Sequence, residues 1–211
     1  MNTPEAVEKP VIACFTPGTK IATVRGETLV EKLVQGDKVV TRDNGMQELR
    51  WIGQKKIDWR IMTANPHLKP VLVRQGSLGN DLPERDLMVS PNHRVLVDSD
   101  RTALEFGSDE VLVAAKHLIG GNSVRSIDSI GTTYIHFMFD RHEVVLSDGI
   151  WTESFQPTDA SLKGFGNSQR AEIFEIFPDL ASPDGRVAYK PARKTLSQDD
   201  LTGLADQPWL A

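Results

Sequence analysis

Short apolar segments alternate with turn residues from residue 19 to about residue 155. Each segment holds only a few residues rich in Val, Ile and Leu, which is the length of a strand and too short for a typical helix. The predicted strands are 20–24, 28–33, 38–41, 71–73, 87–89, 95–97, 134–139 and 143–146, and residues 48–59 continue the pattern. Many short strands separated by turns indicate an all-β domain, and the lack of a regular repeat argues against a propeller or solenoid.

Turn signals divide these segments. Asn44-Gly45 is the strongest, because this pair accepts the positive φ angles of a tight hairpin. Residues 62–70 contain two prolines and are predicted to form a loop, whereas residues 110–119 fit a strand or a helix.

The pattern changes after residue 155. A Gly- and Pro-containing linker is followed by residues 169–177, whose apolar positions have helical spacing, and Ser197 is a predicted N-cap of a further helix. The sequence therefore predicts three parts: a leader (1–13), a β domain (14–155), and a linker with a short helical C-terminal appendage (156–211).

Composition narrows the function classes. The 211 residues suffice for one domain and an appendage, and 39% hydrophobic with 25% charged residues is typical of a globular chain. A net charge of −5 argues against a nucleic-acid partner, which needs a basic face. No apolar run reaches the ~18–20 residues of a membrane helix, so no membrane partner is expected. The N-terminus lacks the basic start and apolar centre of a signal peptide, which favours the cytoplasm and leaves export by a non-classical route open.

Cys14 is the only cysteine, so an intramolecular disulfide and a thiolate metal cluster are excluded, and no cofactor is predicted. A lone cysteine can simply be a small buried apolar residue. Histidines in two later polar segments, 90–93 and 136–142, suggest a second interpretation. A thiol and an imidazole are the pair that nucleophilic catalysis uses, since imidazole can take the thiol proton near neutral pH.

The order of these polar segments resembles the Hint family, the fold shared by inteins and Hedgehog C-terminal regions. Residues 14–23 (CFTPGTKIAT) and Gly36-Asp37 resemble its first conserved block. Residues 87–96 (LMVSPNHRVL) resemble the second, usually Thr-x-x-His, with Ser90 in place of the threonine. Residues 134–154 resemble the C-terminal block. The resemblance covers residues 12–155 and implies a horseshoe-like β fold.

The resemblance also implies a mechanism. The sulfur of Cys14 attacks the carbonyl of Ala13 and converts the Ala13–Cys14 peptide bond into a thioester. His93 protonates the departing amide nitrogen, and Ser90 holds the same peptide by a hydrogen bond. The substrate is then the chain's own N-terminal segment, and a thiol, water or an amine accepts the acyl group.

Two further histidines are candidates by position. His142 aligns with a family histidine that is often structural, and His136 lies near the place where inteins carry an assisting aspartate. Neither histidine belongs to a complete metal-ligand spacing, so no metal site is predicted.

One departure from the family pattern restricts the expected outcome. Splicing inteins end in His-Asn followed by Cys, Ser or Thr, whereas this chain has Glu153, Ser154 and Phe155 at those positions. Serine cannot form the succinimide that asparagine forms, and phenylalanine cannot accept an acyl group. We therefore expect N-terminal cleavage without splicing.

Two hypotheses from different classes stay open. The first is a single-turnover autoproteolytic domain, favoured by Cys14 and His93. The second is a catalytically silent Hint module that binds a partner, with the appendage as the candidate binding surface; Glu153, Ser154 and the short leader favour it. A cysteine peptidase acting on other proteins is disfavoured, because such enzymes place their cysteine at a helix N-terminus and Cys14 precedes a strand.

Overall fold

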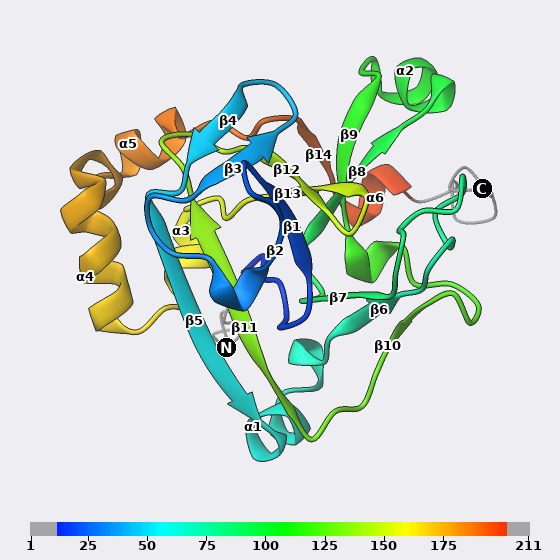
Figure 1. Ribbon diagram of the computed structural model, residues 1–211, viewed down its shortest axis with the longest axis horizontal. Helices are drawn as coiled ribbons and strands as arrows, with labels where there is room; N and C mark the ends of the chain where they lie inside the picture. Colours follow the sequence, from blue (N-terminus) through cyan, green and yellow to red (C-terminus); the bar gives the residue numbers. More distant parts are fainter. Residues whose placement is uncertain (1–11, 202–211) are drawn as a thin grey trace, which may run out of the picture.

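The computed structural model describes residues 12–201, apart from the side chains of residues 100 and 101. The chain forms a β body with helices at its edges (Figure 1). The largest sheet has nine strands, in the order β14-β9-β8-β13-β12-β1-β3-β4, with β2 beside β1. Its strands are β1 (Lys20–Thr23), β2 (Gly26–Leu29), β3 (Lys38–Thr41), β4 (Gly45–Glu48), β8 (Arg94–Asp98), β9 (Glu110–Ala114), β12 (Val144–Ser147), β13 (Ile150–Glu153) and β14 (Lys194–Leu196).

Two smaller groups of strands complete the body. A three-stranded group has the order β10-β6-β7, formed by Val124–Ser126, Val71–Val73 and Leu87–Val89. A long antiparallel pair joins β5 (Trp51–Asp58) to β11 (Gly131–Met138), in register from Trp51 opposite Met138 to Asp58 opposite Gly131. These two strands run side by side along one edge of the molecule in Figure 1.

The helices are short and lie outside the sheets. In Figure 1, α4 and α5 lie outside the β5–β11 pair, and α2 connects the projecting strands β8 and β9. The α-helices are α1 (Trp59–Ala64), α2 (Asp100–Phe106), α3 (Asp159–Leu162), α4 (Asn167–Ile176), α5 (Pro183–Ala188) and α6 (Gln198–Leu201). Single 3-10 turns occur at Val30–Lys32, Pro66–Leu68, Ala115–His117 and Pro178–Ala181.

Hydrophobic burial divides into a main core, a smaller cluster under the appendage, and a third cluster of Cys14, Ile57, Met62 and Tyr134. The main core packs side chains of the sheets, among them Phe15, Phe137 and Phe139, each about 1% exposed. The smaller cluster combines Trp51 of β5 with Ile173 of α4 and the aromatic residues between them. The appendage is therefore packed on the β body, as its helical apolar spacing predicts.

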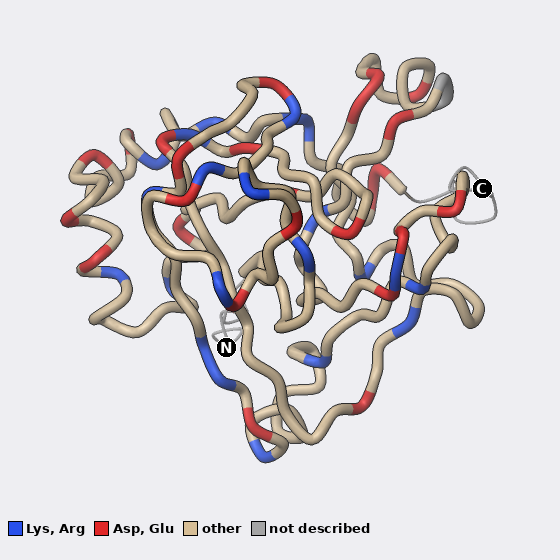
Figure 2. The backbone as a smooth tube through the Cα atoms, viewed as in Figure 1, with Lys and Arg blue, Asp and Glu red and all other residues tan. Residues whose placement is uncertain are grey.

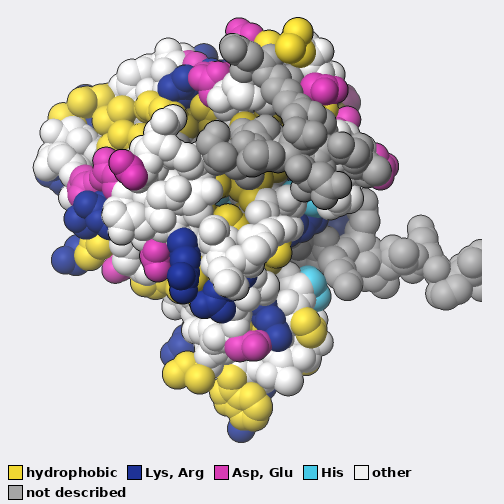
Figure 3. All heavy atoms as spheres, turned by 90° about the vertical axis from the view of Figure 1, so that its right-hand side faces the viewer, with side chains coloured by type: hydrophobic (Ala, Val, Ile, Leu, Met, Phe, Trp, Pro, Cys, Tyr) yellow, Lys and Arg dark blue, Asp and Glu magenta, His cyan; other side chains and the backbone are white. Residues whose placement is uncertain are grey.

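Basic and acidic residues are interspersed along the same elements, as Figure 2 shows. Apolar side chains gather at the tip of the molecule over α1 (Figure 3), where Trp59 is 57% and Ile61 is 40% exposed. In the described part of the chain, no helix combines the length and apolar composition that crossing a bilayer requires.

The structure confirms the all-β prediction and corrects details of it. Strands 38–41, 71–73 and 87–89 have the predicted bounds, and the ambiguous segment 110–119 is strand β9 followed by a 3-10 turn. The predicted strand 28–33 ends at Leu29, where the chain enters a 3-10 turn. Between residues 156 and 201 the appendage has four short α-helices and the strand β14, where the sequence predicts two helices.

Candidate active site

The segment containing Cys14 is inserted between two strands. Phe15 forms β-bridges to Val89, at the end of β7, and to Ile135 of β11. The Phe15 N–H donates to the Ile135 carbonyl at 2.7 Å, and the Ile135 N–H donates back to the Phe15 carbonyl at 2.9 Å. Because backbone bonds fix the residue after the cysteine, Cys14 is held in place with its side chain 3% exposed.

Ser90 holds both peptide groups that flank Ala13. Its hydroxyl accepts a hydrogen bond from the Cys14 N–H at 2.9 Å and donates one to the Ile12 carbonyl at 2.8 Å. The Ser90 N–H also donates to the Cys14 carbonyl at 2.9 Å. The bond between Ala13 and Cys14 is thus held by one residue from the turn after β7, where the sequence places Ser90.

A first prediction concerns this hydroxyl and is independent of any reaction. Ser90 is 3% exposed, so Ser90→Ala leaves the buried Cys14 N–H and the partly buried Ile12 carbonyl without their partner. We expect the variant to lose about 1–3 kcal/mol of unfolding free energy, measured by urea denaturation. Ser90→Thr is the matched control, since it keeps the hydroxyl; equal losses in both variants would contradict the prediction.

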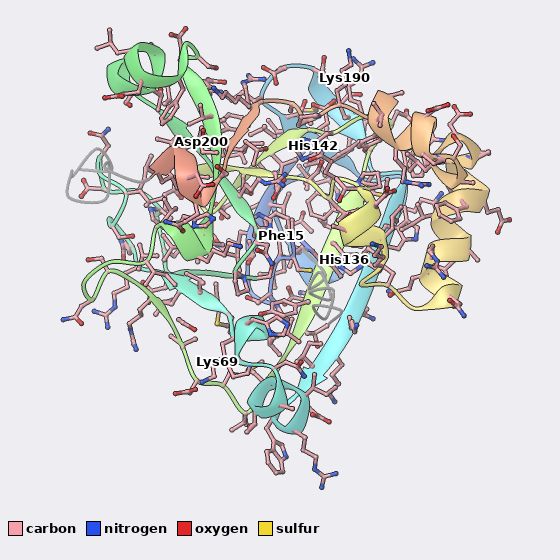
Figure 4. The ribbon with its side chains drawn as sticks, turned by 180° about the vertical axis from the view of Figure 1, so that it is seen from behind. Phe15, Lys69, His136, His142, Lys190 and Asp200 are labelled. Carbon is pink, nitrogen blue, oxygen red and sulfur yellow. The ribbon has the colours of Figure 1, made fainter. Side chains whose placement is uncertain are left out.

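His136 is the histidine in contact with the thiol. It lies on β11, and its Nδ1 is 3.5 Å from the Cys14 sulfur, within the range of a sulfur hydrogen bond. Figure 4 shows His136 between the β5–β11 pair and the appendage, with Phe15 on its inner side. Pairing of the two groups therefore follows from the bridge between Phe15 and Ile135, the residues directly after Cys14 and before His136.

Burial keeps both members of this pair neutral. Desolvation raises the pKa of the Cys14 thiol well above its ordinary value, although the hydrogen bond with Ser90 and the charge of Lys55 oppose it. Desolvation, aided by Lys55, lowers the pKa of His136 to about 3. The resting pair is a thiol facing an uncharged imidazole, and the tautomer with its proton on Nε2 has the Nδ1 lone pair available for the thiol proton.

Three aromatic rings surround His136. Trp51 stacks on it, with centroids 5.3 Å apart, while Phe155 and Phe165 lie at 5.8 and 4.6 Å. The Nε2 atom of His136 is buried and has no hydrogen-bond partner within the described residues. The ring is therefore held by packing.

His93 lies on the other side of Phe15. Its ring packs edge-on against the Phe15 ring at 4.3 Å, it is 1% exposed, and neither ring nitrogen has a partner within residues 12–201. Burial lowers its pKa to about 4, so this imidazole is also uncharged. The Cys14 N–H, which we expected to meet His93, donates to the Ser90 hydroxyl instead. The acid role of His93 stays a prediction.

His142 belongs to a separate cluster at the end of β13. Its Nδ1 accepts the Ala192 N–H at 2.9 Å, so its proton is on Nε2, which lies 3.1 Å from the Ser154 carbonyl and 3.3 Å from the Glu153 carboxylate. Figure 4 shows His142 well away from His136. No group of three or more His, Cys, Asp or Glu in the described chain could hold a metal ion.

Glu153 is the charge at the centre of this second cluster. It is 1% exposed and accepts two hydrogen bonds from Arg94, one from the side chain and one from the backbone, both at 2.9 Å. Burial alone would raise the pKa of this carboxyl, but Arg94, His142 and His93 together lower it below its ordinary value. The glutamate that departs from the family pattern is thus a buried, ionised partner of Arg94.

A cavity of about 510 Å³ opens beside the Cys14 sulfur. Its walls are mainly apolar, from Ile57, Ile61 and Leu68, and Lys55 supplies a positive charge. A small molecule in this space would meet the thiol and His136 together.

Sequence reasoning missed the supporting residues of the site. Lys55 and Trp51 lie on β5 and Phe165 lies in the appendage, and none of them belongs to a recognisable polar motif. The strand Trp51–Asp58 also contains Gln54, Lys56 and Asp58, so no signal in the sequence distinguishes Lys55.

The fold and the site define a β domain with a cysteine before its first strand and a histidine from a later strand at its sulfur. A family model described as the Hint domain matches residues 13–159, more than half of the chain. The chain therefore belongs to the Hint domain family, as the resemblance predicts. Domains of the Hint and intein type typically process themselves.

Solved structures with a similar fold include inteins and an intein-like domain. The bacterial intein-like domain from Clostridium thermocellum has 14% identity and a TM-score of 0.44, covering 67% of this chain and 97% of that one. The gp41-1 intein has 12% identity and a TM-score of 0.41, with coverages of 66% and 97%. A DnaB intein from Synechocystis sp. PCC 6803 has 11% identity and a TM-score of 0.40, with coverages of 67% and 98%. No curated protein matches the chain.

Proposed function

We propose that this domain cleaves its own chain once, by an N–S acyl shift at the Ala13–Cys14 bond, and releases the N-terminal segment without splicing. One observation carries the proposal: Ser90 holds the peptide groups on both sides of Ala13 while the Cys14 sulfur faces His136 Nδ1 at 3.5 Å. Nucleophile and target lie in adjacent residues, so the reaction needs no substrate-binding step.

In the first step the thiol proton moves to His136 Nδ1 as the Cys14 sulfur bonds to the Ala13 carbonyl carbon. The bond from that carbon to the Cys14 nitrogen then breaks, and the nitrogen becomes an amine by taking up one proton. His136 can return this proton, because burial and Lys55 both disfavour its charged form. The result is a thioester between Ala13 and Cys14, with no net gain or loss of protons.

A second step must transfer the acyl group from Cys14 to an acceptor. The cavity beside the sulfur would admit a thiol, water or an amine to the thioester. Attack forms the new acyl bond and returns a free thiol to Cys14. A reducing compartment such as the cytoplasm would keep this cysteine unoxidised and provide thiols.

The packing of the C-terminal boundary supports cleavage without splicing. Ser154 is 1% exposed, with its N–H donated to the Glu143 carbonyl and its hydroxyl accepting the Glu143 N–H. Phe155 is 2% exposed and donates its N–H to the Phe137 carbonyl. Neither side chain can perform the ring closure or acyl acceptance that splicing requires.

Intact mass measurement tests the proposal. We expect the purified wild-type chain to lose residues 1–13, with the loss accelerated by dithiothreitol, whereas Cys14→Ala stays at full length. Cys14→Ser is the matched control, since its hydroxyl occupies the same place with far weaker nucleophilicity. A full-length wild-type mass at every thiol concentration would instead favour the silent binding module, an alternative supported by the burial of the thiol.

A further inference from the structure

We propose that Phe165, in the appendage, is a positioning residue that holds the His136 ring against the Cys14 thiol. Phe165 lies beyond residue 159, where the family match ends. The proposal deepens the function proposed above, and part of its test does not depend on cleavage. It assigns the appendage a role in the site.

The contact between the two rings is close and buried. The Phe165 ring meets His136 edge-on, with centroids 4.6 Å apart and an interplanar angle of 78°. Phe165 also packs against Phe155 at 5.1 Å and Trp51 at 5.8 Å, and it is only 6% exposed. Of the three rings around His136, Phe165 has the shortest centroid distance.

The orientation of His136 depends on this packing. Proton transfer requires the Nδ1 lone pair to point at the Cys14 sulfur, so rotation of the ring would remove it from reach. Catalytic histidines are usually oriented by a polar group on the second nitrogen, but His136 Nε2 has no such partner in the described chain. Ring packing replaces that polar group here.

The packing leaves little freedom to the ring. At Gly53, opposite His136 in the β5–β11 register, an added Cβ would lie 2.8 Å from His136 Nε2 and 2.5 Å from the Trp51 ring. Glycine therefore makes room for the two stacked rings on this side. Phe165 closes the edge-on side of the same ring.

The segment carrying Phe165 is fixed to the strand that carries Trp51. The Lys55 ammonium donates to the Gly164 carbonyl at 3.2 Å, and the Gln169 side chain donates to the Gln54 carbonyl at 3.1 Å. The Trp51 indole N–H donates to Glu172 of α4 at 3.3 Å. Contacts on both sides of Phe165 therefore hold it against β5.

Cleavage rate is the first test. We expect Phe165→Ala to slow thiol-induced release of residues 1–13 by about 10- to 100-fold, because misplacement of a reacting group by about 1 Å can cost about 10²-fold. Phe165→Leu keeps apolar bulk at the same place and should recover most of the rate. Phe174→Ala is the matched control, since Phe174 packs in the same cluster without a ring contact to His136, and it should stay within about threefold of wild type.

A second measurement is independent of cleavage. In full-length chains that also carry Cys14→Ala, the His136 ring is titrated by NMR. We expect Phe165→Ala to move the pKa of His136 from about 3 toward its ordinary value, because loss of the Phe165 ring lets water reach the imidazole. Phe174→Ala should leave this pKa unchanged. Equal titration of His136 in the two variants would overturn the proposal, whereas a shift without any wild-type cleavage would support the positioning and reject the processing reaction.

Discussion

His136→Gln is expected to slow release of the N-terminal segment by about 10²- to 10⁴-fold, the range that a positioned general base contributes. Glutamine keeps a polar group of similar length but cannot take up the thiol proton. The Cys14 thiol is buried and its pKa is raised, so uncatalysed loss of its proton is slow. The rate is measured as the fraction of cleaved chain against time in dithiothreitol.

His93→Gln separates the roles of the two buried histidines. His136 Nδ1 lies 3.5 Å from the sulfur, whereas the His93 ring packs against the ring of Phe15, the residue after Cys14. A larger rate loss in the His136 variant would assign the thiol proton to His136. If only the His93 variant lost activity, the assignment of His136 as base would be wrong.

His136→Gln also has a predicted effect on stability at acid pH. Folding lowers the pKa of His136 from 6.5 to about 3, so between these values the unfolded chain binds more protons than the folded one. Stability from this group is therefore present above pH 6.5 and is lost progressively as the pH falls toward 3. His136→Gln should lose less stability than wild type between pH 7 and pH 5, measured by urea denaturation at both pH values.

The largest expected loss of stability comes from Arg94→Met. The Glu153 carboxylate is 1% exposed and accepts a 2.9 Å hydrogen bond from the Arg94 guanidinium, which the substitution removes, and one from the Arg94 backbone N–H, which it keeps. Removing the guanidinium leaves a buried charge without its main partner, which typically costs about 3–5 kcal/mol. The unfolding free energy at pH 7 is the measured quantity.

Lys20→Met is a matched control on an exposed ion pair. Lys20 and Glu27 are 2.9 Å apart, like Arg94 and Glu153, but their side chains are 37% and 42% exposed. Solvent screening makes such a pair worth about 0–1 kcal/mol. Similar losses in the two variants would show that burial of Glu153 does not set the strength of its interaction with Arg94.

The double variant Arg94→Met with Glu153→Gln should recover part of the stability, because no charge is left buried.

The sequence predicts the β body well, since short apolar segments alternate with turn residues such as Gly, Asn and Pro. Segments such as 71–73 and 87–89 pair with each other and match their predicted bounds. The strand β14 could not be predicted, because Lys194–Leu196 has no alternating pattern of useful length and forms only by pairing with β9. Helix α1 was missed for a similar reason: it has six residues, and its apolar positions continue those of the preceding strand.

The proximity of Cys14 and Ser90 in the candidate site could be predicted from their motifs. Cys14 and Ser90 are hydrogen-bonded to each other across 76 positions, as the order of the two motifs implies. The proximity of His136 to the thiol depends on the register of the Phe15–Ile135 bridge, which sequence alone does not fix. The three aromatic rings around His136 are still harder to predict from the sequence, because Trp51, Phe155 and Phe165 have the pattern of ordinary core residues.

The position of β14 has a consequence for any shortened version of this domain. β14 runs parallel to β9 at the outer end of the large sheet, with Lys194 to Leu196 opposite Val111 to Val113. A chain trimmed at the family boundary would lack this strand and would expose the backbone N–H and C=O groups along that side of β9. An unpaired strand flanked by buried valines and leucine is a template for association between molecules. We therefore expect a chain trimmed at residue 159 to associate more readily than the full chain, because β14 covers this side of β9.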